Sequence, residues 1–252
     1  MNGKEGLMLD VQDLKKSFSG HRALAGLSFS LPKGHIYGLL GPNGAGKTTT
    51  LKILAGLLAP DAGHIYINKE MYRRDRSDLK RRIAYVPDQP FLYSKLTGEE
   101  HLHFFADLYR LPRAVRTEKL DFLFRYFEFE EYRRELVENY SAGTKQKLLI
   151  SQALLVEPDL LLLDEPLVSI DPLVGRKFKK HLRDIAARGT VVIFATHILS
   201  LAQEICHTIG VIIRGRIAAA GPVAELIAGC GGLSLEDFYF DLVMRHDGFS
   251  QA

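Results

Sequence analysis

Residues 41–48 read Gly41-Pro42-Asn43-Gly44-Ala45-Gly46-Lys47-Thr48 and match the phosphate-binding loop pattern GxxxxGK[ST]. An apolar run at residues 36–40 precedes the loop and a helical pattern at residues 48–57 follows it, as this motif requires. Backbone N–H groups of such a loop surround phosphate oxygens, Lys47 supplies a positive charge for the β and γ phosphates, and Thr48 is expected to hold Mg²⁺. The loop therefore predicts a nucleoside triphosphate site. A dinucleotide site is the weaker alternative, because Thr49 stands where GxGxxG requires Gly or Ala.

Two acidic residues follow a second apolar run, which spans residues 160–163 and is directly followed by Asp164 and Glu165. In a parallel α/β sheet, ligands bind at the carboxyl ends of the strands. We therefore expect Asp164 to reach the Mg²⁺ shell and Glu165 to orient or deprotonate the attacking water.

Short apolar runs alternate with helical patterns along the chain, which predicts an α/β domain with a mostly parallel sheet. The runs are residues 36–40, 65–68, 83–86, 160–163, 191–195 and 208–213. Several are continuously apolar, as expected for strands that are covered on both faces. The strict alternation at residues 27–31 instead predicts an antiparallel strand with one exposed face, and so an antiparallel β subdomain near the N-terminus.

The pattern is helical from about residue 94 to residue 139, which indicates an inserted helical subdomain. It opens with Thr97, three residues before Glu100, as in a capping box. Residues 91–140 contain seven of the 14 Phe and five of the 10 Tyr residues. Filling the core of a small subdomain is the main explanation of this density, and a groove for a partner protein is the other.

Composition excludes several classes of protein. The 252 residues are 46% hydrophobic and 25% charged, which is typical of a globular protein and excludes a disordered or fibrous one. A net charge of +3 gives no reason to expect a nucleic-acid partner. No apolar run approaches the about 20 residues that span a bilayer, no secretory signal is apparent, and two Cys residues indicate neither a disulfide framework nor a structural metal site. We therefore expect a cytoplasmic protein.

These motifs together resemble those of the ATP-binding subunits of ABC transporters, and the resemblance covers almost the whole chain. In that family a glutamine follows a strand after the phosphate-binding loop, and Gln89 stands there, with Mg²⁺ and the attacking water as its implied contacts. The family's Leu-Ser-Gly-Gly-Gln signature aligns with residues 140–144, which read Tyr-Ser-Ala-Gly-Thr. Ser141 and Gly143 are retained, and an Ala with negative φ fits at Ala142. The following Lys-Gln-Lys makes this version similar to those of bacterial export-type transporters.

The resemblance also implies roles for three residues outside these motifs. Asp171 ends the loop after the acidic pair, His197 follows the next strand and is expected to contact the γ-phosphate, and Phe18 stands where the family places an aromatic ring against adenine. The complete set of implied nucleotide-binding residues is Phe18, Gly41, Pro42, Asn43, Gly44, Ala45, Gly46, Lys47, Thr48, Thr49, Ser141, Ala142, Gly143 and Asp171. The implied catalytic residues are Glu165, His197 and Gln89, and the implied metal ligands are Thr48, Gln89 and Asp164.

We expect one ABC-type ATPase domain that binds ATP and Mg²⁺. Residues 1–93 and 156–230 would form its catalytic core and β subdomain, residues 94–155 the helical signature subdomain and residues 231–252 a C-terminal tail. The implied function is ATP hydrolysis that energises transport through dimer closure, at the cytoplasmic face of the membrane. The implied partners are a transmembrane subunit and a second ATP-binding subunit, identical or different.

Two alternatives to a transporter subunit remain. One is a soluble ABC-type ATPase that acts as a mechanical or regulatory module, although those usually have two ATPase halves or coiled-coil arms and this chain has neither. The other is a phosphate-loop kinase or GTPase, which conflicts with the signature segment and with the lack of an Asn/Thr-Lys-x-Asp motif.

Overall fold

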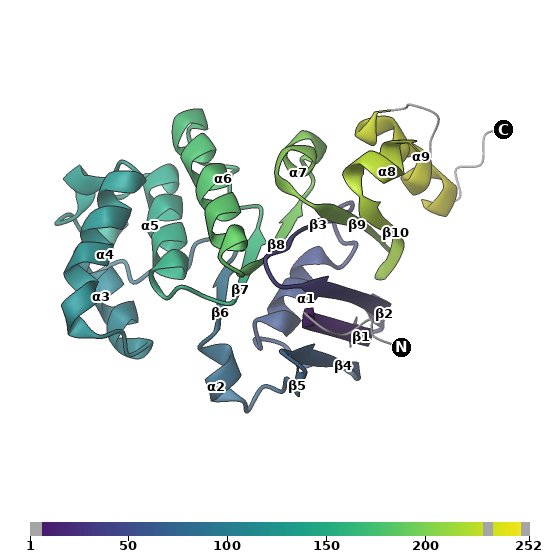
Figure 1. Cartoon of the computed structure of the whole chain (residues 1–252), viewed down its shortest axis with the longest axis horizontal. Helices are drawn as coiled ribbons and strands as arrows, with labels where there is room; N and C mark the ends of the chain where they lie inside the picture. The colour runs from purple at the N-terminus through teal and green to yellow at the C-terminus, as the bar shows by residue number, and fades with distance from the viewer. Residues whose placement is uncertain (1–6, 229–233, 248–252) are drawn as a thin grey trace.

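A six-stranded sheet forms the centre of the structure, a computed structural model that describes residues 7–228 and 234–247. Its strand order is β10-β9-β3-β8-β7-β6, and neighbouring strands are parallel except for β10, which runs antiparallel to β9 (Figure 1). The strands are β3 (Ile36–Leu40), β6 (Ile83–Val86), β7 (Leu160–Asp164), β8 (Val191–Thr196), β9 (Thr208–Ile213) and β10 (Arg216–Pro222). The expected α/β class with a mostly parallel sheet is confirmed.

Both faces of the sheet are covered, which explains the continuously apolar runs of its strands. Alternate residues of β7 belong to different cores: Leu161 and Leu163 pack with the helices α3 to α6, whereas Leu160 and Leu162 pack with α1 (Lys47–Leu54) and the second sheet. Every residue of β7 is therefore buried. This two-sided burial holds the carboxyl ends of the strands rigidly beside the loop that precedes α1.

The second sheet is antiparallel and has the strand order β2-β1-β4-β5. Its strands are β1 (Leu7–Phe18), β2 (His21–Pro32), β4 (Ala62–Ile67) and β5 (Glu70–Met71). Leu27 and Leu31 are buried while Ser28 and Ser30 are exposed, so the alternation at residues 27–31 does mark a strand with one exposed face. Residues 65–67 of the apolar run at 65–68 lie in β4, so the expectation that this run belongs to the mostly parallel sheet is wrong.

An inserted helical subdomain packs against one side of the core (Figure 1). It contains α3 (Gly98–Leu108), α4 (Arg113–Tyr126), the 3-10 turns η1 (Glu130–Tyr132) and η2 (Val137–Asn139), and α5 (Ala142–Leu155). The capping box at the start of α3 is present, since Thr97 accepts a hydrogen bond from the Glu100 backbone N–H and the Glu100 carboxylate accepts one from that of Thr97. The aromatic side chains divide into two groups: Phe124, Phe127 and Phe129 are fully buried, whereas Phe91 and Phe104 are exposed.

The remaining helices connect the strands or follow the last one. They are α2 (Ser77–Lys80), α6 (Pro172–Ala187), α7 (Leu199–Ile205), α8 (Val223–Ala228) and α9 (Leu235–Asp247). α9 lies in the segment expected to be a C-terminal tail, and its buried Leu235 packs in a small core with residues of α7 and β9. No helix among the described residues is both long enough and apolar enough to cross a membrane.

Candidate functional site

The phosphate-binding loop runs from the end of β3 into the first turn of α1. Gly46 caps α1 with φ 114°, in the left-handed region, and a Cβ atom there would lie 2.6 Å from the Ala23 carbonyl oxygen. Only glycine satisfies both the backbone conformation and this close approach. The loop therefore has its shape because its glycines let the chain pass tightly against β2.

Lys47 folds back over the loop, and its ammonium donates hydrogen bonds to the carbonyl oxygens of Gly41 (2.6 Å) and Pro42 (3.1 Å). Its side chain is buried. Burial lowers the pKa of Lys47, and the nearby charges of Glu165 and Asp164 oppose that shift. The ammonium thus lies inside the loop, opposite two carboxylates.

Asp164 ends β7 and is the more deeply buried of the two acidic residues, with 1% of its surface exposed. Burial raises the pKa of its carboxyl group, while a hydrogen bond from the Thr48 hydroxyl stabilises the charged form. The Tyr85 hydroxyl also lies 3.4 Å from Asp164 Oδ2. A buried carboxylate beside a threonine hydroxyl offers the hard oxygen donors that Mg²⁺ prefers.

Glu165 is held by the end of the neighbouring strand β8. Its backbone has φ 48°, and its N–H donates to the Ala195 carbonyl oxygen at 3.0 Å. Its carboxylate accepts hydrogen bonds from the Thr196 hydroxyl (2.9 Å) and from the backbone N–H of His197 (2.9 Å). The His197 ring Nδ1 lies 2.7 Å from the same carboxylate. β7 and β8 together therefore orient this side chain.

A cavity of about 190 Å³ joins the loop to these strand ends. Its lining consists of Asn43, Gly44, Gly46, Lys47, Thr48, Thr49, Asp88, Asp164 and Glu165. The predicted phosphate-loop and acidic residues thus meet at one place. Among the described residues, no group of three or more His, Cys, Asp or Glu side chains is placed to hold a metal ion.

Gln89 is not part of this lining. Its side chain is exposed, and its backbone N–H donates to Asp88 Oδ1 at 2.8 Å. Asp88 does line the cavity, and the roles expected of Gln89 stay predictions.

The signature residues and Asp171 also lie outside this cavity, at the starts of two helices. Ser141 caps α5 by accepting a hydrogen bond from the Thr144 backbone N–H at 3.1 Å, and Ala142 begins the helix with a helical backbone. A Cβ atom on Gly143 would lie 2.7 Å from the Ser169 carbonyl oxygen, so glycine keeps α5 close to the loop before α6. Asp171 caps α6, and the backbone N–H groups of Val174 and Leu173 lower the pKa of its carboxyl group.

Phe18 is separate again, at the end of β1. Its ring is 42% exposed, and the Lys16 ammonium lies 5.5 Å from the ring centroid. The ring therefore has a free face on the β subdomain and is not packed in a core.

Sequence reasoning missed two residues of this site, Asp88 and Thr196. Thr196 ends β8 one residue before His197, and a hydroxyl at the carboxyl end of the strand beside β7 is a signal that could have identified it. Asp88 had a weaker signal, because Asp88 and Gln89 are adjacent polar residues and either could face the loop.

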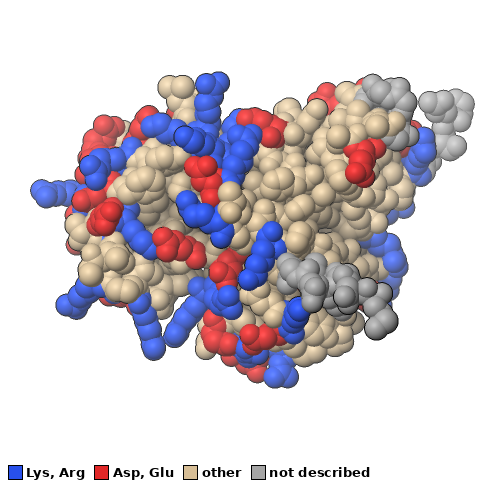
Figure 2. Space-filling model, viewed as in Figure 1, with Lys and Arg blue, Asp and Glu red and all other residues tan. Residues whose placement is uncertain are grey.

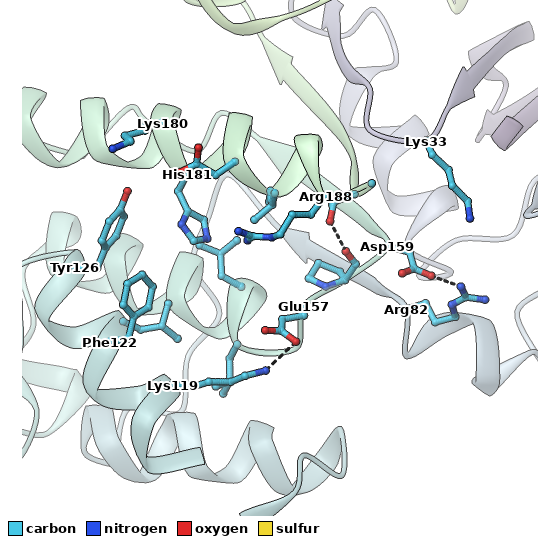
Figure 3. Close-up of a pocket in the computed structure, with 18 of the residues that line it drawn as sticks. Lys33, Arg82, Lys119, Phe122, Tyr126, Glu157, Asp159, Lys180, His181 and Arg188 are labelled. Atoms are coloured by element: carbon cyan, nitrogen blue, oxygen red, sulfur yellow. Dashed lines mark hydrogen bonds and ion pairs between the residues drawn. The ribbon is translucent and has the colours of Figure 1, made fainter. Parts of the chain in front are cut away.

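A larger cavity of about 840 Å³ lies at the opposite edge of the sheet, where Asp159 and Thr190 precede β7 and β8 (Figure 3). Ion pairs span parts of it, Lys119 with Glu157 at 3.0 Å and Arg82 with Asp159. Figure 2 likewise shows Lys and Arg side chains interspersed with Asp and Glu over the helical subdomain. This larger cavity lacks the glycine-rich loop, so the smaller one is the better phosphate site despite its size.

Comparison with known proteins identifies relatives of this arrangement. A family model described as ABC transporter matches residues 24–168. The ABC-type transporter ATP-binding protein EcsA of Bacillus subtilis (strain 168) is 32% identical over 243 residues, which cover 96% of this chain and 98% of that protein. The Nod factor export ATP-binding protein I of Ralstonia nicotianae (strain ATCC BAA-1114 / GMI1000) is 33% identical, with 93% and 73% covered. A solved structure of an ATP-binding subunit of an ABC transporter superposes with a TM-score of 0.87 at 35% identity, covering 93% of this chain and 99% of that one.

Proposed function

Because this chain belongs to the ABC transporter family and is one of its ATP-binding subunits, we propose that it binds ATP with Mg²⁺ between the phosphate-binding loop and the ends of β7 and β8, and that hydrolysis there drives transport through a membrane-spanning partner. The observation that carries this proposal is the convergence of Lys47, Thr48, Asp164 and Glu165 on one cavity. ATP hydrolysis is the activity of the family, and the relatives do not favour a soluble module or a kinase.

In this proposal the loop and Lys47 bind the triphosphate. Backbone N–H groups at the start of α1 point toward the phosphates, and the helix dipole adds a favourable potential. The Lys47 ammonium exchanges the carbonyl oxygens of Gly41 and Pro42 for phosphate oxygens, which are the stronger acceptors because they are charged. Asn43, Gly44, Gly46 and Thr49 complete the wall around the phosphates.

The residues present fit Mg²⁺, because Thr48 and the buried Asp164 offer hard oxygen atoms next to the phosphate position. Bound there, the ion would neutralise charge on the phosphates and orient them. Thr48 and Asp164 would hold it, directly or through water.

Glu165 is the proposed general base. The hydrogen bonds from Thr196 and His197 fix the carboxylate, so that it does not have to be reoriented when water attacks the γ-phosphate. His197, whose side chain is 59% exposed, can turn toward the γ-phosphate once nucleotide is bound. The two residues thereby form a pair that senses the phosphate.

The remaining predicted residues require a second ATP-binding subunit. We place the Ser141, Ala142 and Gly143 segment against the nucleotide of the partner chain, with Asp171 at the junction, since these residues lie outside the cavity of their own chain. Phe18 would stack on adenine through its free face. Each nucleotide would thus lie between two chains, and its contacts with both would stabilise the closed dimer.

The membrane-spanning partner would dock on an exposed aromatic cluster, which consists of the exposed Phe91, Tyr93 and Phe104 and the half-buried Phe105. Tyr93 packs against Phe104 with ring centroids 5.1 Å apart, and Phe91 is 83% exposed. Gln89 precedes this cluster in the same loop, so we propose that this loop also senses the partner. The similarity to a Nod factor export protein supports export as the direction of transport.

Replacement of Lys47 tests the nucleotide site. We expect Lys47→Ala to lower ATP affinity at least about tenfold, because a buried charge-assisted contact is lost. Lys52→Ala is the matched control, since Lys52 lies in the same helix but outside the cavity lining. Equilibrium binding of ATP to the folded variants measures the effect, and unchanged affinity in Lys47→Ala would refute the site.

A further inference from the structure

We propose that Asp88, and not Gln89, is the residue of the loop after β6 that faces the metal–nucleotide complex in this chain. Three carboxylates then line the same cavity as one lysine, and we expect ATP binding to depend strongly on a divalent cation. This inference rests on the proposed function and assigns the metal-facing side chain of that same site.

The first support is the course of the chain. β6 pairs in parallel with β7, with Val86 opposite Leu163, so the residues that follow Val86 leave the sheet beside Asp164 and Glu165. Both side chains are exposed, but Asp88 lines the cavity and Gln89 does not. The hydrogen bond from the Gln89 backbone N–H to Asp88 Oδ1, at 2.8 Å, fixes the carboxylate in this position.

The second support is the electrostatic influence of Asp88 on its neighbours. Its carboxylate lies close enough to Asp164 and to Tyr85 for its charge to act on both. The carboxylates that act on Lys47 are instead Glu165 and Asp164. Asp88 therefore lies on the Asp164 side of the cavity, where Thr48 also donates its hydrogen bond.

The consequence is an excess of negative charge. Asp88, Asp164 and Glu165 face the single cation Lys47 in the cavity lining. A triphosphate without metal would be repelled by this arrangement, whereas a divalent cation would be attracted by both the carboxylates and the phosphates. A neutral amide at position 88 would offer an oxygen atom without the charge, and so would couple the metal to the nucleotide more weakly.

The substitution that tests this is Asp88→Asn, which keeps the side-chain shape and the acceptor for the Gln89 N–H. We would measure ATP affinity in EDTA and in saturating MgCl₂ for the full chain and for the variant. We expect Asp88→Asn to bind metal-free ATP more tightly than the unsubstituted chain does. We also expect the factor by which Mg²⁺ increases ATP affinity to be about tenfold smaller in the variant. Binding of Mn²⁺ to the protein–ATP complex, followed by its electron paramagnetic resonance signal, should weaken in parallel.

The controls separate this inference from general damage. Asp75→Asn removes a carboxylate from an exposed loop outside the cavity lining, where Asp75 pairs with Arg73 at 3.7 Å, and should leave the Mg²⁺ dependence unchanged. An equal loss of affinity with and without metal in Asp88→Asn would overturn the inference, because it would indicate distortion of the loop. An unchanged metal dependence in Asp88→Asn, or a loss in Gln89→Ala as large as that expected for Asp88→Asn, would overturn it too.

The proposed function is tested independently by Lys47→Ala. If Lys47→Ala loses ATP affinity while Asp88→Asn behaves as the unsubstituted chain, the nucleotide site stands and only the role of Asp88 is wrong. If Lys47→Ala binds ATP normally, the site itself is wrong.

Discussion

At the scale of single residues, the carboxylate of Glu165 shows how the site is organised before substrate arrives. Thr196 and His197 provide three contacts to it, all from the end of β8. A general base must be correctly oriented, and these contacts hold the carboxylate in one orientation. Orientation of the base is therefore built into the sheet and does not depend on a mobile loop.

Glu165→Gln separates binding from chemistry. The amide keeps one oxygen acceptor for the contacts from β8 but cannot accept a proton, so we expect ATP affinity within about threefold of the unsubstituted chain and turnover reduced at least about 10²-fold. ATP binding and phosphate release measure the two effects. Rapid turnover by this variant would remove Glu165 from its role, and lost affinity would mean that the carboxylate mainly shapes the pocket.

The acidic pair was predictable because it follows a buried strand, and strand ends in a parallel sheet meet at one edge. The choice between Asp88 and Gln89 was not. Adjacent residues in a loop point in different directions, and which of them faces inward depends on backbone angles that no local pattern specifies. The roles of both residues stay predictions.

At the scale of elements, the start of α3 is tied to the residue that precedes the signature segment. Gly98 is the first residue of α3, and a Cβ atom on it would overlap the Tyr140 hydroxyl. That hydroxyl donates a 2.6 Å hydrogen bond to the Tyr132 carbonyl oxygen, and the Tyr140 side chain is buried. Tyr in place of the family's Leu is therefore accommodated by a glycine from another helix.

Gly98→Ala should destabilise the helical subdomain by about 1–3 kcal/mol, because the added methyl group forces a buried ring to move. Urea unfolding followed by circular dichroism measures this. Tyr140→Phe alone should lower the free energy of unfolding by about 1 kcal/mol, because a hydrogen bond is lost. The double variant should lose less stability than the two single variants together. Additive losses would show that Gly98 and Tyr140 do not restrict each other.

The capping box at Thr97 was predictable, because its two hydrogen bonds join residues three apart. The Gly98–Tyr140 contact was not, since it joins residues far apart in sequence. Helix α9 was also missed, because its fit depends on the small core around Leu235 and not on a strong local signal.

At the scale of the whole molecule, the loop after β6 connects the phosphate site to the surface that a partner would contact. The phosphate site lies at the strand ends, and the exposed aromatic cluster lies at the start of the helical subdomain. The fold class was predictable because the alternation of apolar runs with helical patterns along the chain can be seen in the sequence. The division of the aromatic residues into core and surface was not predictable, because composition does not distinguish a buried Phe from an exposed one.

Phe91→Glu tests the aromatic cluster as the docking surface. Phe91 is 83% exposed, so the substitution should leave folding and the ATPase activity of the isolated chain unchanged. Recovery of a polytopic membrane protein with the tagged chain, from detergent-solubilised membranes, should fall about tenfold or more. Phe240→Glu is the control, because Phe240 is 62% exposed on α9. Equal recovery with both variants would show that the partner binds elsewhere.

The backbone of Glu165 has a consequence for how this subunit can evolve. Its φ of 48° lies in the left-handed region, which Gly, Asn and Asp tolerate better than most other residues. A duplicated gene could therefore exchange the proposed base for one of these residues without disturbing the turn after β7. We expect the product of that gene to fold and bind ATP, and to pair with the parent chain as a subunit that does not hydrolyse ATP. The backbone angle at this one residue thus allows a single substitution to convert a dimer with two catalytic sites into a dimer with one.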